Sequence, residues 1–185
     1  MKKLSAKELR LLEETKAQEF LKKRKRQPIY FILEDIFDTY NIGGIFRLAD
    51  ALAAQKIFLC GQTEIPPNPK IKKASVGTYK VVPWEYKKSV FQALLAIKKE
   101  TKKVSIVAIE QSKNSQLFTK IKYRFPIAFI VGNETKGIKA KTLALADKIV
   151  EIPMFGLNKS LNVIVAAAIV SYFAVSQQKF FQKIS

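Results

Sequence analysis

The sequence predicts a single α/β domain built on a parallel sheet, because strand-like and helix-like segments alternate along most of its 185 residues. The strand-like runs are apolar without alternation, as strands covered on both faces are. They are PIYFILE (28–34), KIFLC (56–60), VSIVAIE (104–110), PIAFIVG (126–132) and KIVEIP (148–153). Helical patterns separate them: NIGGIFRLADALAA (41–54), YKKSVFQALLAIKKE (86–100), a short one at 139–146 and a long terminal one from Ser160. A content of 48% hydrophobic residues is enough to bury one core.

A basic extension precedes this domain. Residues 4–24 follow a helical pattern, and we expect Pro28 to stop that helix. Five consecutive cations near its end favour contact with phosphates, although such a run is usually a solvated face. They are Lys22, Lys23, Arg24, Lys25 and Arg26. The sequence is thus divided into an extension, residues 1–28, and a main domain, residues 29–185.

The composition narrows the function. With 33 basic and 15 acidic residues, the net charge of +18 and the pI near 10.0 predict a polyanionic partner. One cysteine, Cys60, and no histidine argue against a disulfide or a metal site and favour a reducing, cytoplasmic setting. The N-terminus has no signal-peptide pattern, and polar residues interrupt the charge-free run between Lys159 and Lys179. We therefore expect that run to form a buried or interface helix and not a membrane span.

Three loops follow predicted strands and combine glycine with polar side chains. They are DIFDTYNIGGIFR (35–47), GNETKG (132–137) and PMFGLNKSLN (153–162). Ligands gather beyond the carboxyl ends of strands in open α/β sheets, so we expect a site here. GNETKG lacks the Lys-Ser/Thr pair of a phosphate loop and carries Glu134 instead, which argues against a nucleoside triphosphate as its ligand. Asn41 could cap a helix and Arg47 could be an ordinary surface arginine.

Together these loops resemble the SpoU (TrmH) family of RNA 2′-O-ribose methyltransferases, within the SPOUT superfamily. DIFDTYNIGGIFRLADAL resembles the first motif of the family, with Asn41 and Arg47 at its polar positions. FIVGNETKGI resembles the second motif, and IPMFGLNKSLNVIVAAAIVSY resembles the third. KASVGTYKVVPW is similar to a family linker in which Ser75 and Gly77 recur. The resemblance covers residues 29–175, in the order and spacing of the family.

The resemblance implies a C-terminal deep trefoil knot, which general topology rules could not have predicted. It implies S-adenosylmethionine as methyl donor, bound in the knot without any metal. The expected cofactor-binding residues are Ile109, Glu110, Gly132, Asn133, Ile152, Met154 and Leu161. It also implies a homodimer through the C-terminal helix, for which the candidate contacts are Val163, Ala167, Val170 and Phe173.

The expected catalytic residues are Arg47, Asn41, Glu134, Ser160 and Asn162. A ribose 2′-hydroxyl is a poor nucleophile, so the protein must align it with the donor and help to remove its proton. The family account gives that proton to the arginine that matches Arg47. The alternative is that Arg47 clamps a phosphate while Glu134 or water accepts the proton, because a guanidinium gives up its proton with difficulty. Asn41 would orient the substrate or Arg47, and Ser160 with Asn162 would brace the site.

The substrate is predicted with less detail. Transfer RNA is favoured, with a D-loop guanosine as target, over ribosomal RNA; a catalytically silent RNA-binding protein is the alternative from another class. The sequence departs from the family at three positions: Ala53 replaces a usual glycine, Lys136 a common acidic residue, and Tyr40 a frequent histidine. None of these touches the predicted catalytic residues.

Overall fold

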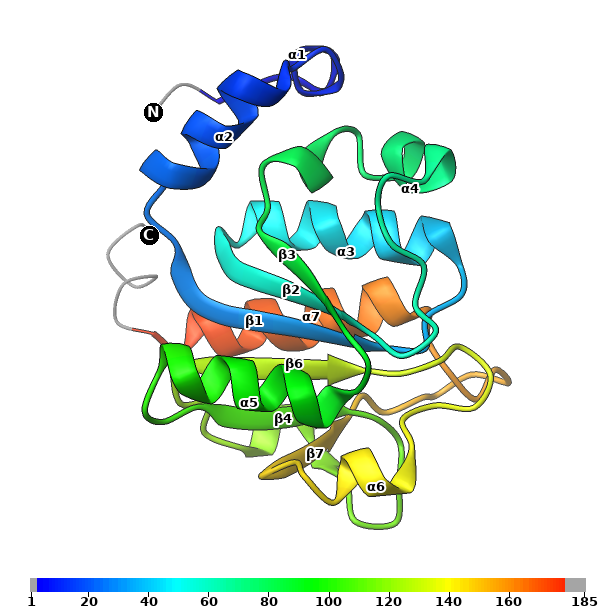
Figure 1. The fold of residues 1–185 in the computed structure, drawn as a ribbon. Helices are drawn as coiled ribbons and strands as arrows, with labels where there is room; N and C mark the ends of the chain where they lie inside the picture. The colour runs from blue at the N-terminus through cyan, green and yellow to red at the C-terminus, as the bar shows by residue number, and fades with distance from the viewer. Residues whose placement is uncertain (1–2, 179–185) are drawn as a thin grey trace.

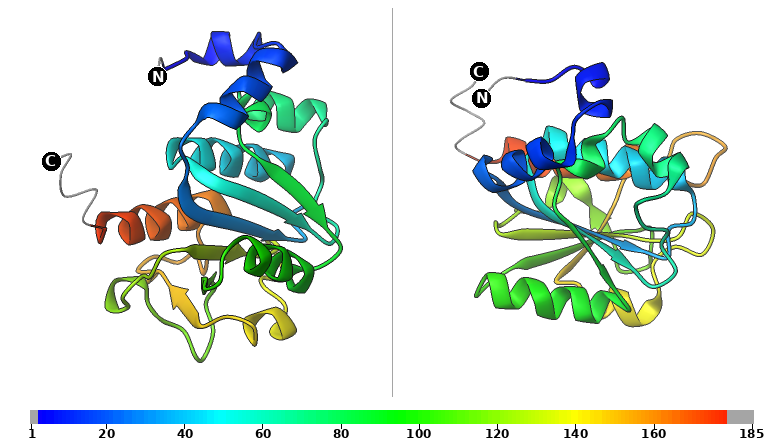
Figure 2. Two further views of the ribbon diagram at one scale, coloured as in Figure 1. Left: turned by 60° about the vertical axis from the view of Figure 1, so that its left-hand side comes forward. Right: turned by 45° about the horizontal axis from the view of Figure 1, so that its top comes forward.

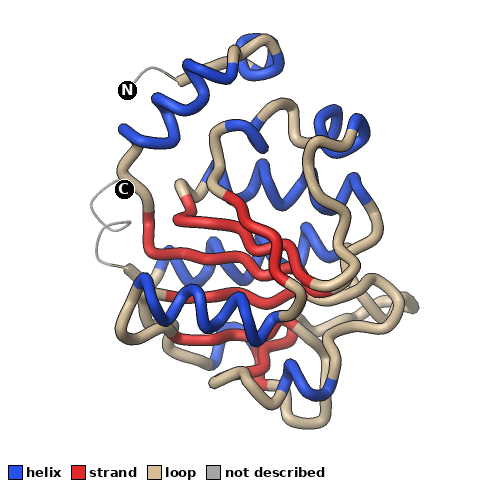
Figure 3. Tube along the Cα trace, in the orientation of Figure 1, coloured by secondary structure: helices blue, strands red, loops and turns tan. Residues whose placement is uncertain are grey.

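The computed structural model describes residues 3–178 and contains, within them, one parallel sheet of seven strands (Figures 1 and 3). The strands are β1 (Gln27–Glu34), β2 (Ala54–Cys60), β3 (Trp84–Lys87), β4 (Ser105–Ile109), β5 (Gln116–Leu117), β6 (Ile127–Val131) and β7 (Lys148–Glu151). Their order across the sheet is β3-β2-β1-β6-β4-β7-β5. The five predicted strands are all present. The short edge strands β3 and β5 were not predicted, and β3 includes the first residues of a segment predicted as helix.

Helices cover both faces of the sheet (Figure 2). On one face lie α3 (Thr39–Ala51) and α7 (Val163–Ser176), and on the other α5 (Val90–Glu100) and α6 (Ala140–Leu143). The unpredicted helix α4 (Pro69–Ala74) packs against α3. Along β1, Phe31 and Leu33 face the α3 and α7 side while Tyr30 and Ile32 face the α5 side. This alternation of buried residues on both faces explains why the strand sequences are apolar throughout.

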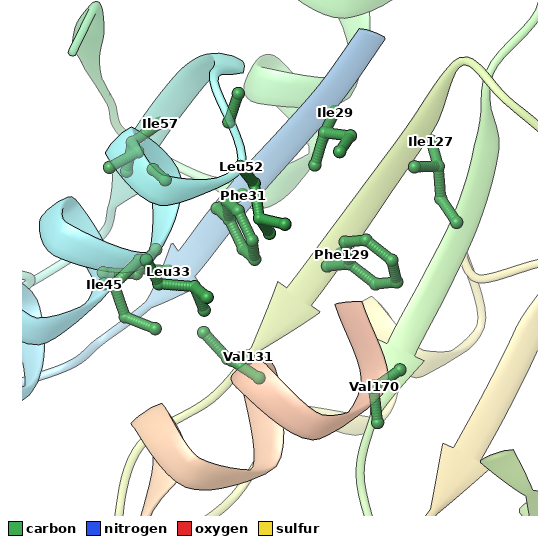
Figure 4. Close-up of a cluster of buried hydrophobic side chains, with 14 of the residues drawn as sticks. Ile29, Phe31, Leu33, Ile45, Leu52, Ile57, Ile127, Phe129, Val131 and Val170 are labelled. Carbon is green, nitrogen blue, oxygen red and sulfur yellow. The ribbon is translucent and has the colours of Figure 1, made fainter. Parts of the chain in front are cut away.

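The core under α3 and α7 is the larger of the two (Figure 4). Phe31 of β1 and Phe129 of β6 are fully buried there, with ring centroids 5.8 Å apart. The terminal helix was predicted from Ser160 but begins at Val163, because the Asn162 side chain accepts the Ile164 amide at 2.9 Å and caps it. No helix among residues 3–178 is long and apolar enough to cross a membrane.

Two of the four α7 residues predicted to form a dimer contact are buried within the chain itself. Ala167 and Val170 are completely buried in the core, and Val163 and Phe173 are partly buried against it. Ala167 and Val170 are therefore wrong as contact residues. The helix is apolar all round, so the sequence pattern could not distinguish its inner from its outer side. The exposed apolar residues of α7 are Val165, Ile169 and Tyr172.

The strand registers bring the three polar loops to one edge of the sheet. Leu33 of β1 pairs with Val131 of β6, and Ile109 of β4 pairs with Val150 of β7. Because all these strands run parallel, the segments that follow them leave the sheet side by side. The loops after β1, β6 and β7 are the three that the sequence singled out.

The N-terminal extension contains two helices, α1 (Ala6–Arg10) and α2 (Glu14–Lys23), where one was expected. They lie beside the segment that leads into β3 (Figure 2). Lys80 donates from Nζ to the Leu12 carbonyl at 2.6 Å, and a Cβ at Gly77 would meet the Leu9 carbonyl oxygen at 2.4 Å. Pro28 lies inside β1 and not at a helix end, since α2 ends at Lys23. The extension is thus docked closely on the domain.

Candidate functional site

A chain of side-chain hydrogen bonds joins the three polar loops. Asn41 of α3 donates from Nδ2 to Glu134 Oε1 at 2.8 Å, and its Oδ1 accepts from Asn162 Nδ2 at 2.9 Å. The Asp38 amide donates to the same Glu134 oxygen at 3.4 Å. Three of the five predicted catalytic residues, far apart in the sequence, are therefore in direct contact. We call this set the amide–carboxylate cluster.

The position of Asn41 excludes the simpler interpretation that it caps a helix. Asp38 is the N-cap of α3, where its side chain accepts the Tyr40 amide at 2.8 Å. Asn41 lies within the first turn and is only 3% exposed. A buried amide that loses its partners is costly, so the bonds to Glu134 and Asn162 hold both loops in place.

Two adjacent glycines let α3 approach its neighbours closely. A Cβ on Gly44 would lie 2.2 Å from Cδ1 of Ile164 on α7, and one on Gly43 would lie 2.4 Å from Cβ of Ala74 on α4. A Cβ on Gly43 would also meet backbone atoms of Ala74 and Ser75, so it would push α4 away, whereas a Cβ on Gly44 would require the Ile164 side chain to move. Gly43 therefore permits the close approach of α3 to α4, and Gly44 leaves room for Ile164 of α7 beside α3.

Arg47 lies apart from the cluster. It is exposed on α3 and, within residues 3–178, has no hydrogen-bond or ion-pair partner. It follows Asn41 by six residues, which is about 9 Å along a helix axis. Its guanidinium is therefore free to bind an anion from solvent, and the structure gives no contact between it and Glu134.

The GNETKG loop is held by its own hydrogen bonds. Asn133 donates from Nδ2 to the Asp35 carbonyl at 2.9 Å, and its Oδ1 accepts the amides of Thr135 and Lys136 at 3.0 and 2.9 Å. Gly137 has φ +65°, a conformation that suits glycine. Asn133 is thus a loop-forming residue here, and neither it nor Gly132 lines the crevice described next, although both were predicted to bind the cofactor.

A crevice with a volume of about 130 Å³ lies beyond the ends of β4 and β7. Six of the predicted site residues line it: Ile109, Glu110, Ile152, Met154, Ser160 and Leu161. Sequence reasoning missed Gln111, Val150, Glu151 and Ala166. Gln111 and Glu151 directly adjoin predicted residues and Val150 lies within a predicted strand, which is the signal that could have found these three. Ser160 links this crevice to the loop that carries Asn162.

The lining of the crevice constrains its ligand. Apolar side chains form its walls and two carboxylates, Glu110 and Glu151, are part of it. Glu110 accepts the Ile138 and Gln111 amides at 2.8 and 2.9 Å, and Glu151 accepts the Ser115 hydroxyl at 2.6 Å. Carboxylates here disfavour a phosphorylated cofactor and suit a cationic one with an apolar face. Residues 3–178 contain no cluster of His, Cys, Asp or Glu suited to a metal ion.

A second polar group lies at the same sheet edge, on the α5 side. Asp35 forms an ion pair with Lys139 and accepts the Gln62 amide at 2.8 Å. Burial alone would raise the pKa of Asp35, but the Gln62 amide and Lys139 together lower it below its ordinary value. Cys60 nearby is fully buried, and burial raises the pKa of its thiol to about 12, which disfavours the reactive thiolate.

Fold and site together define a parallel-sheet α/β protein whose open crevice and amide–carboxylate cluster share one sheet edge. The family model for the SpoU rRNA Methylase family matches residues 28–172, so the chain belongs to the SpoU family. This confirms the family that the three motifs predicted.

Relatives of two kinds are similar to this chain. The tRNA (guanosine(18)-2′-O)-methyltransferase of Aquifex aeolicus is 32% identical over 168 residues, which are 88% of this chain and 75% of that protein. A 23S rRNA (guanosine-2′-O-)-methyltransferase of Blochmanniella floridana is 31% identical over 83% of this chain and 59% of its own length. The crystal structure of the SpoU methyltransferase AviRb from Streptomyces viridochromogenes, in complex with AdoMet, matches with a TM-score of 0.74 and 27% identity over 84% of this chain and 63% of that one.

Proposed function

We propose that this protein transfers the methyl group of S-adenosylmethionine to a ribose 2′-hydroxyl of transfer RNA, with a D-loop guanosine as target. The observation that carries this proposal is the cluster of Asn41, Glu134 and Asn162 beside a crevice suited to a cationic cofactor. The names of the relatives support the reaction and the substrate, and the net charge of +18 suits any structured RNA.

The crevice would hold the methyl donor through Ile109, Glu110, Ile152, Met154 and Leu161. Its volume of about 130 Å³ is smaller than a typical ligand pocket of about 300 Å³ or more, so part of the donor would extend into the open mouth. When bound, the donor supplies an electrophilic methyl group. Gly132 and Asn133 would shape the neighbouring wall from the loop after β6.

The residues of the cluster would position the acceptor and receive its proton. Both hydrogen bonds to Glu134 fall on Oε1, so within the described residues Oε2 has no partner and is available to the 2′-hydroxyl. Asn41 would keep the carboxylate oriented, and Asn162 would keep Asn41 oriented. Ser160, exposed at the crevice, would brace the acceptor from the other side.

Arg47 would act on the phosphate next to the target ribose. Its exposed guanidinium, without a partner in the described part of the chain, suits a bidentate contact with a phosphate and would lower the energy of the charge that develops on the ribose oxygen. A guanidinium keeps its proton, so we favour Glu134 over Arg47 as proton acceptor.

The basic extension would add affinity for RNA. Of the five cations, Arg24 and Arg26 direct their guanidiniums to the protein: Arg24 pairs with Asp50, and Arg26 donates to the carbonyls of Ala54 and Val81 at 3.2 and 2.9 Å. The exposed Lys22 and Lys25 are then the ones that would reach phosphates, together with Lys23, whose ion pair with Glu19 at 3.1 Å is exposed and would have to open. In this proposal residues 1–28 form the extension, and residues 29–185 form the methyltransferase domain.

Three further features belong to this proposal. The chain after β7 would form the deep trefoil knot around the donor. Two copies would dimerise through the exposed apolar stripe of α7, Val165, Ile169 and Tyr172, whose spacing places them on one side of the helix. The enzyme would work in the cytoplasm, where its RNA substrate is found.

The decisive experiment maps ribose methylation by mass spectrometry in total RNA from cells with and without this protein. We expect one transfer RNA position to lose its 2′-O-methyl group, and a ribosomal position instead would support the rRNA alternative. In parallel, the purified protein is mixed with labelled S-adenosylmethionine and unmodified transfer RNA. RNA binding without methyl incorporation in either assay would indicate a catalytically silent RNA-binding protein.

A further inference from the structure

A groove on the outer side of the amide–carboxylate cluster has no role in the proposed chemistry. Its volume is about 550 Å³, and it lies between residues 37–40 and the start of α4. Two aromatic rings line it, Phe37 and Tyr40, and they are 51% and 57% exposed. Neither ring contributes to a buried core.

Hydrogen bonds of Asp38, which lies between the two aromatic residues in the sequence, connect the rings to the amide–carboxylate cluster. Asp38 accepts the Tyr40 amide at 2.8 Å and donates its own amide to Glu134 Oε1 at 3.4 Å. Tyr40 also directly precedes Asn41, whose side chain binds the same carboxylate oxygen. A ligand that lay on these rings would therefore be next to the group proposed to receive the ribose proton.

Positive charge borders the groove on the far side. Lys70 of α4 lines it, and Lys73 follows three residues later, on the same side of that helix. Asp38 and Glu64 also line the groove, so an anionic group would be favoured only where it contacts Lys70. Exposed rings together with this lysine match an unpaired nucleotide, whose base stacks while its phosphate binds a cation.

We propose that Phe37 and Tyr40 form a stacking platform for an unpaired base of the RNA substrate, next to the methylated nucleotide, with Lys70 binding the phosphate of that nucleotide. This inference rests on the proposed function and goes further, because it requires the RNA to be unstacked at the site.

The test measures RNA affinity separately from methyl transfer. The probe is a fluorescein-labelled, unmodified transfer RNA transcript, and its binding is followed by fluorescence anisotropy. We expect Phe37→Ala and Tyr40→Ala each to raise the Kd for RNA by about 5- to 100-fold, the range found for loss of one stacked base. Tyr40→Phe keeps the ring and should bind RNA with the same Kd as the wild-type protein. Calorimetry should show S-adenosylmethionine affinity unchanged within about twofold in every variant.

A matched control is Phe91→Ala on α5, because Phe91 is 55% exposed, close to the exposure of the two groove rings. We expect its RNA affinity to stay within about twofold of the unmodified protein. Should the two groove variants bind RNA as tightly as Phe91→Ala, the platform is refuted. Phe37→Leu and Tyr40→Leu keep apolar bulk without a ring, so full RNA affinity in these variants would also refute stacking.

The phosphate contact has its own readout. Lys70→Ala should reduce the slope of log K against log salt by about 0.7 to 1, the contribution of one phosphate contact. Lys98→Ala, an exposed lysine on α5, should leave the slope unchanged. Equal slopes for both lysine variants would remove Lys70 from the proposal.

The affinity readout also separates this inference from the proposed function. A protein that binds the transcript but transfers no methyl group would contradict the proposed function, while the groove variants would still decide whether the platform exists. A protein that does not bind RNA at all would overturn both.

Discussion

Two arginines of the N-terminal extension, Arg24 and Arg26, have surroundings opposite to those of Arg47 on α3. Arg24 pairs with Asp50 and donates to its carbonyl at 2.9 Å, and Arg26 binds two carbonyls of the domain. Burial, with the nearby Arg24, lowers the pKa of Arg26, against a smaller opposing effect of Asp50. Arg47 is exposed and, among the described residues, has no partner.

The difference teaches that a basic run is not one functional unit. Within Lys22 to Arg26, the guanidiniums attach the extension to the domain and the lysines remain exposed. The planar guanidinium with its five donors suits attachment to carbonyls and a carboxylate, whereas a lysine offers a mobile point charge. A cation is available to RNA only if the protein leaves it accessible, and Arg47 meets that criterion whereas Arg24 and Arg26 do not.

Arg47→Ala tests this comparison with the largest expected effect. Because the guanidinium would stabilise charge that develops during transfer, we expect kcat/KM for RNA methylation to fall by about 100-fold or more. The Kd for S-adenosylmethionine should change less than about twofold, measured by calorimetry. Arg47→Lys keeps the positive charge but loses the paired N–H donors of the guanidinium, so it should retain only part of the wild-type rate. Equal loss of donor affinity and rate would assign Arg47 a structural role.

Glu134→Gln distinguishes between the two possible proton acceptors. The amide oxygen of glutamine can still accept from Asn41, so the cluster remains while the carboxylate is lost. We expect the rate of methyl transfer at saturating substrate to fall by about 100-fold, within the range of a lost general base. Single-turnover kinetics with labelled donor provide the measurement. Retained turnover would exclude Glu134 as acceptor and leave water or Arg47.

Much of the fold and part of the site could be predicted from the sequence. Parallel strands buried on both faces leave continuous apolar runs, and the polar loops after them predicted the correct sheet edge. The strands β3 and β5 are short and lie at the sheet edges, so they carry no such pattern. The inner face of α7 could not be identified either, because a helix that is apolar all round has no periodic signal.

At the site, residue types were predictable but contacts were not. Asn41 and Glu134 were identified as site residues, yet their hydrogen bond depends on how the first turn of α3 meets the loop held by Asn133. The motif also gave no sign that Arg47 would lie outside this hydrogen-bonded cluster. The groove of Phe37 and Tyr40 involves α4, which begins at Pro69 in a stretch that gave no helical prediction.

Arg24→Ala and Lys25→Ala test the comparison inside the extension. Removing Arg24 leaves Asp50 unpaired at a part-buried position, so we expect the free energy of unfolding to fall by about 1–2 kcal/mol. Lys25 is exposed, so its removal should change that free energy by less than about 0.5 kcal/mol. Urea denaturation measures both. In RNA binding the order should be reversed, with the larger loss in Lys25→Ala; a larger loss in Arg24→Ala would show that the docked extension itself is needed.

Asp35 adds a pH-dependent test at the catalytic edge. Its folded pKa lies below the ordinary value of 3.8, so its contribution to stability is present above that pH and is lost as the pH falls through the lower folded value. Asp35→Asn keeps the shape and tolerates the backbone φ of +52°, but it loses the charge that pairs with Lys139. At pH 7 we expect the free energy of unfolding of Asp35→Asn to be about 1 kcal/mol lower than that of the wild-type protein. This difference should shrink below about pH 4, as Asp35 loses its charge. Urea denaturation from pH 7 to acid measures this, and a constant difference would contradict the assignment.

Ala53→Gly has the smallest expected effect. The substitution lies next to Asp50, the residue that pairs with Arg24. Ala53 has φ +48°, its amide donates to the Asp50 carbonyl at 3.0 Å, and its carbonyl accepts the Gln27 amide at 2.8 Å. These hydrogen bonds hold Ala53 in a left-handed conformation, which costs an alanine about 1–2 kcal/mol. A glycine avoids that cost but loses about 0.5–1 kcal/mol more in entropy on folding, so its net advantage is smaller. We expect Ala53→Gly to raise the free energy of unfolding by about 0.5 kcal/mol. The control Ala51→Gly, at the end of α3, should lower it, since helical φ offers glycine no advantage. If Ala53→Gly and Ala51→Gly destabilise the protein equally, the backbone at Ala53 is not strained. The glycine that is usual in the family at this position then has another cause.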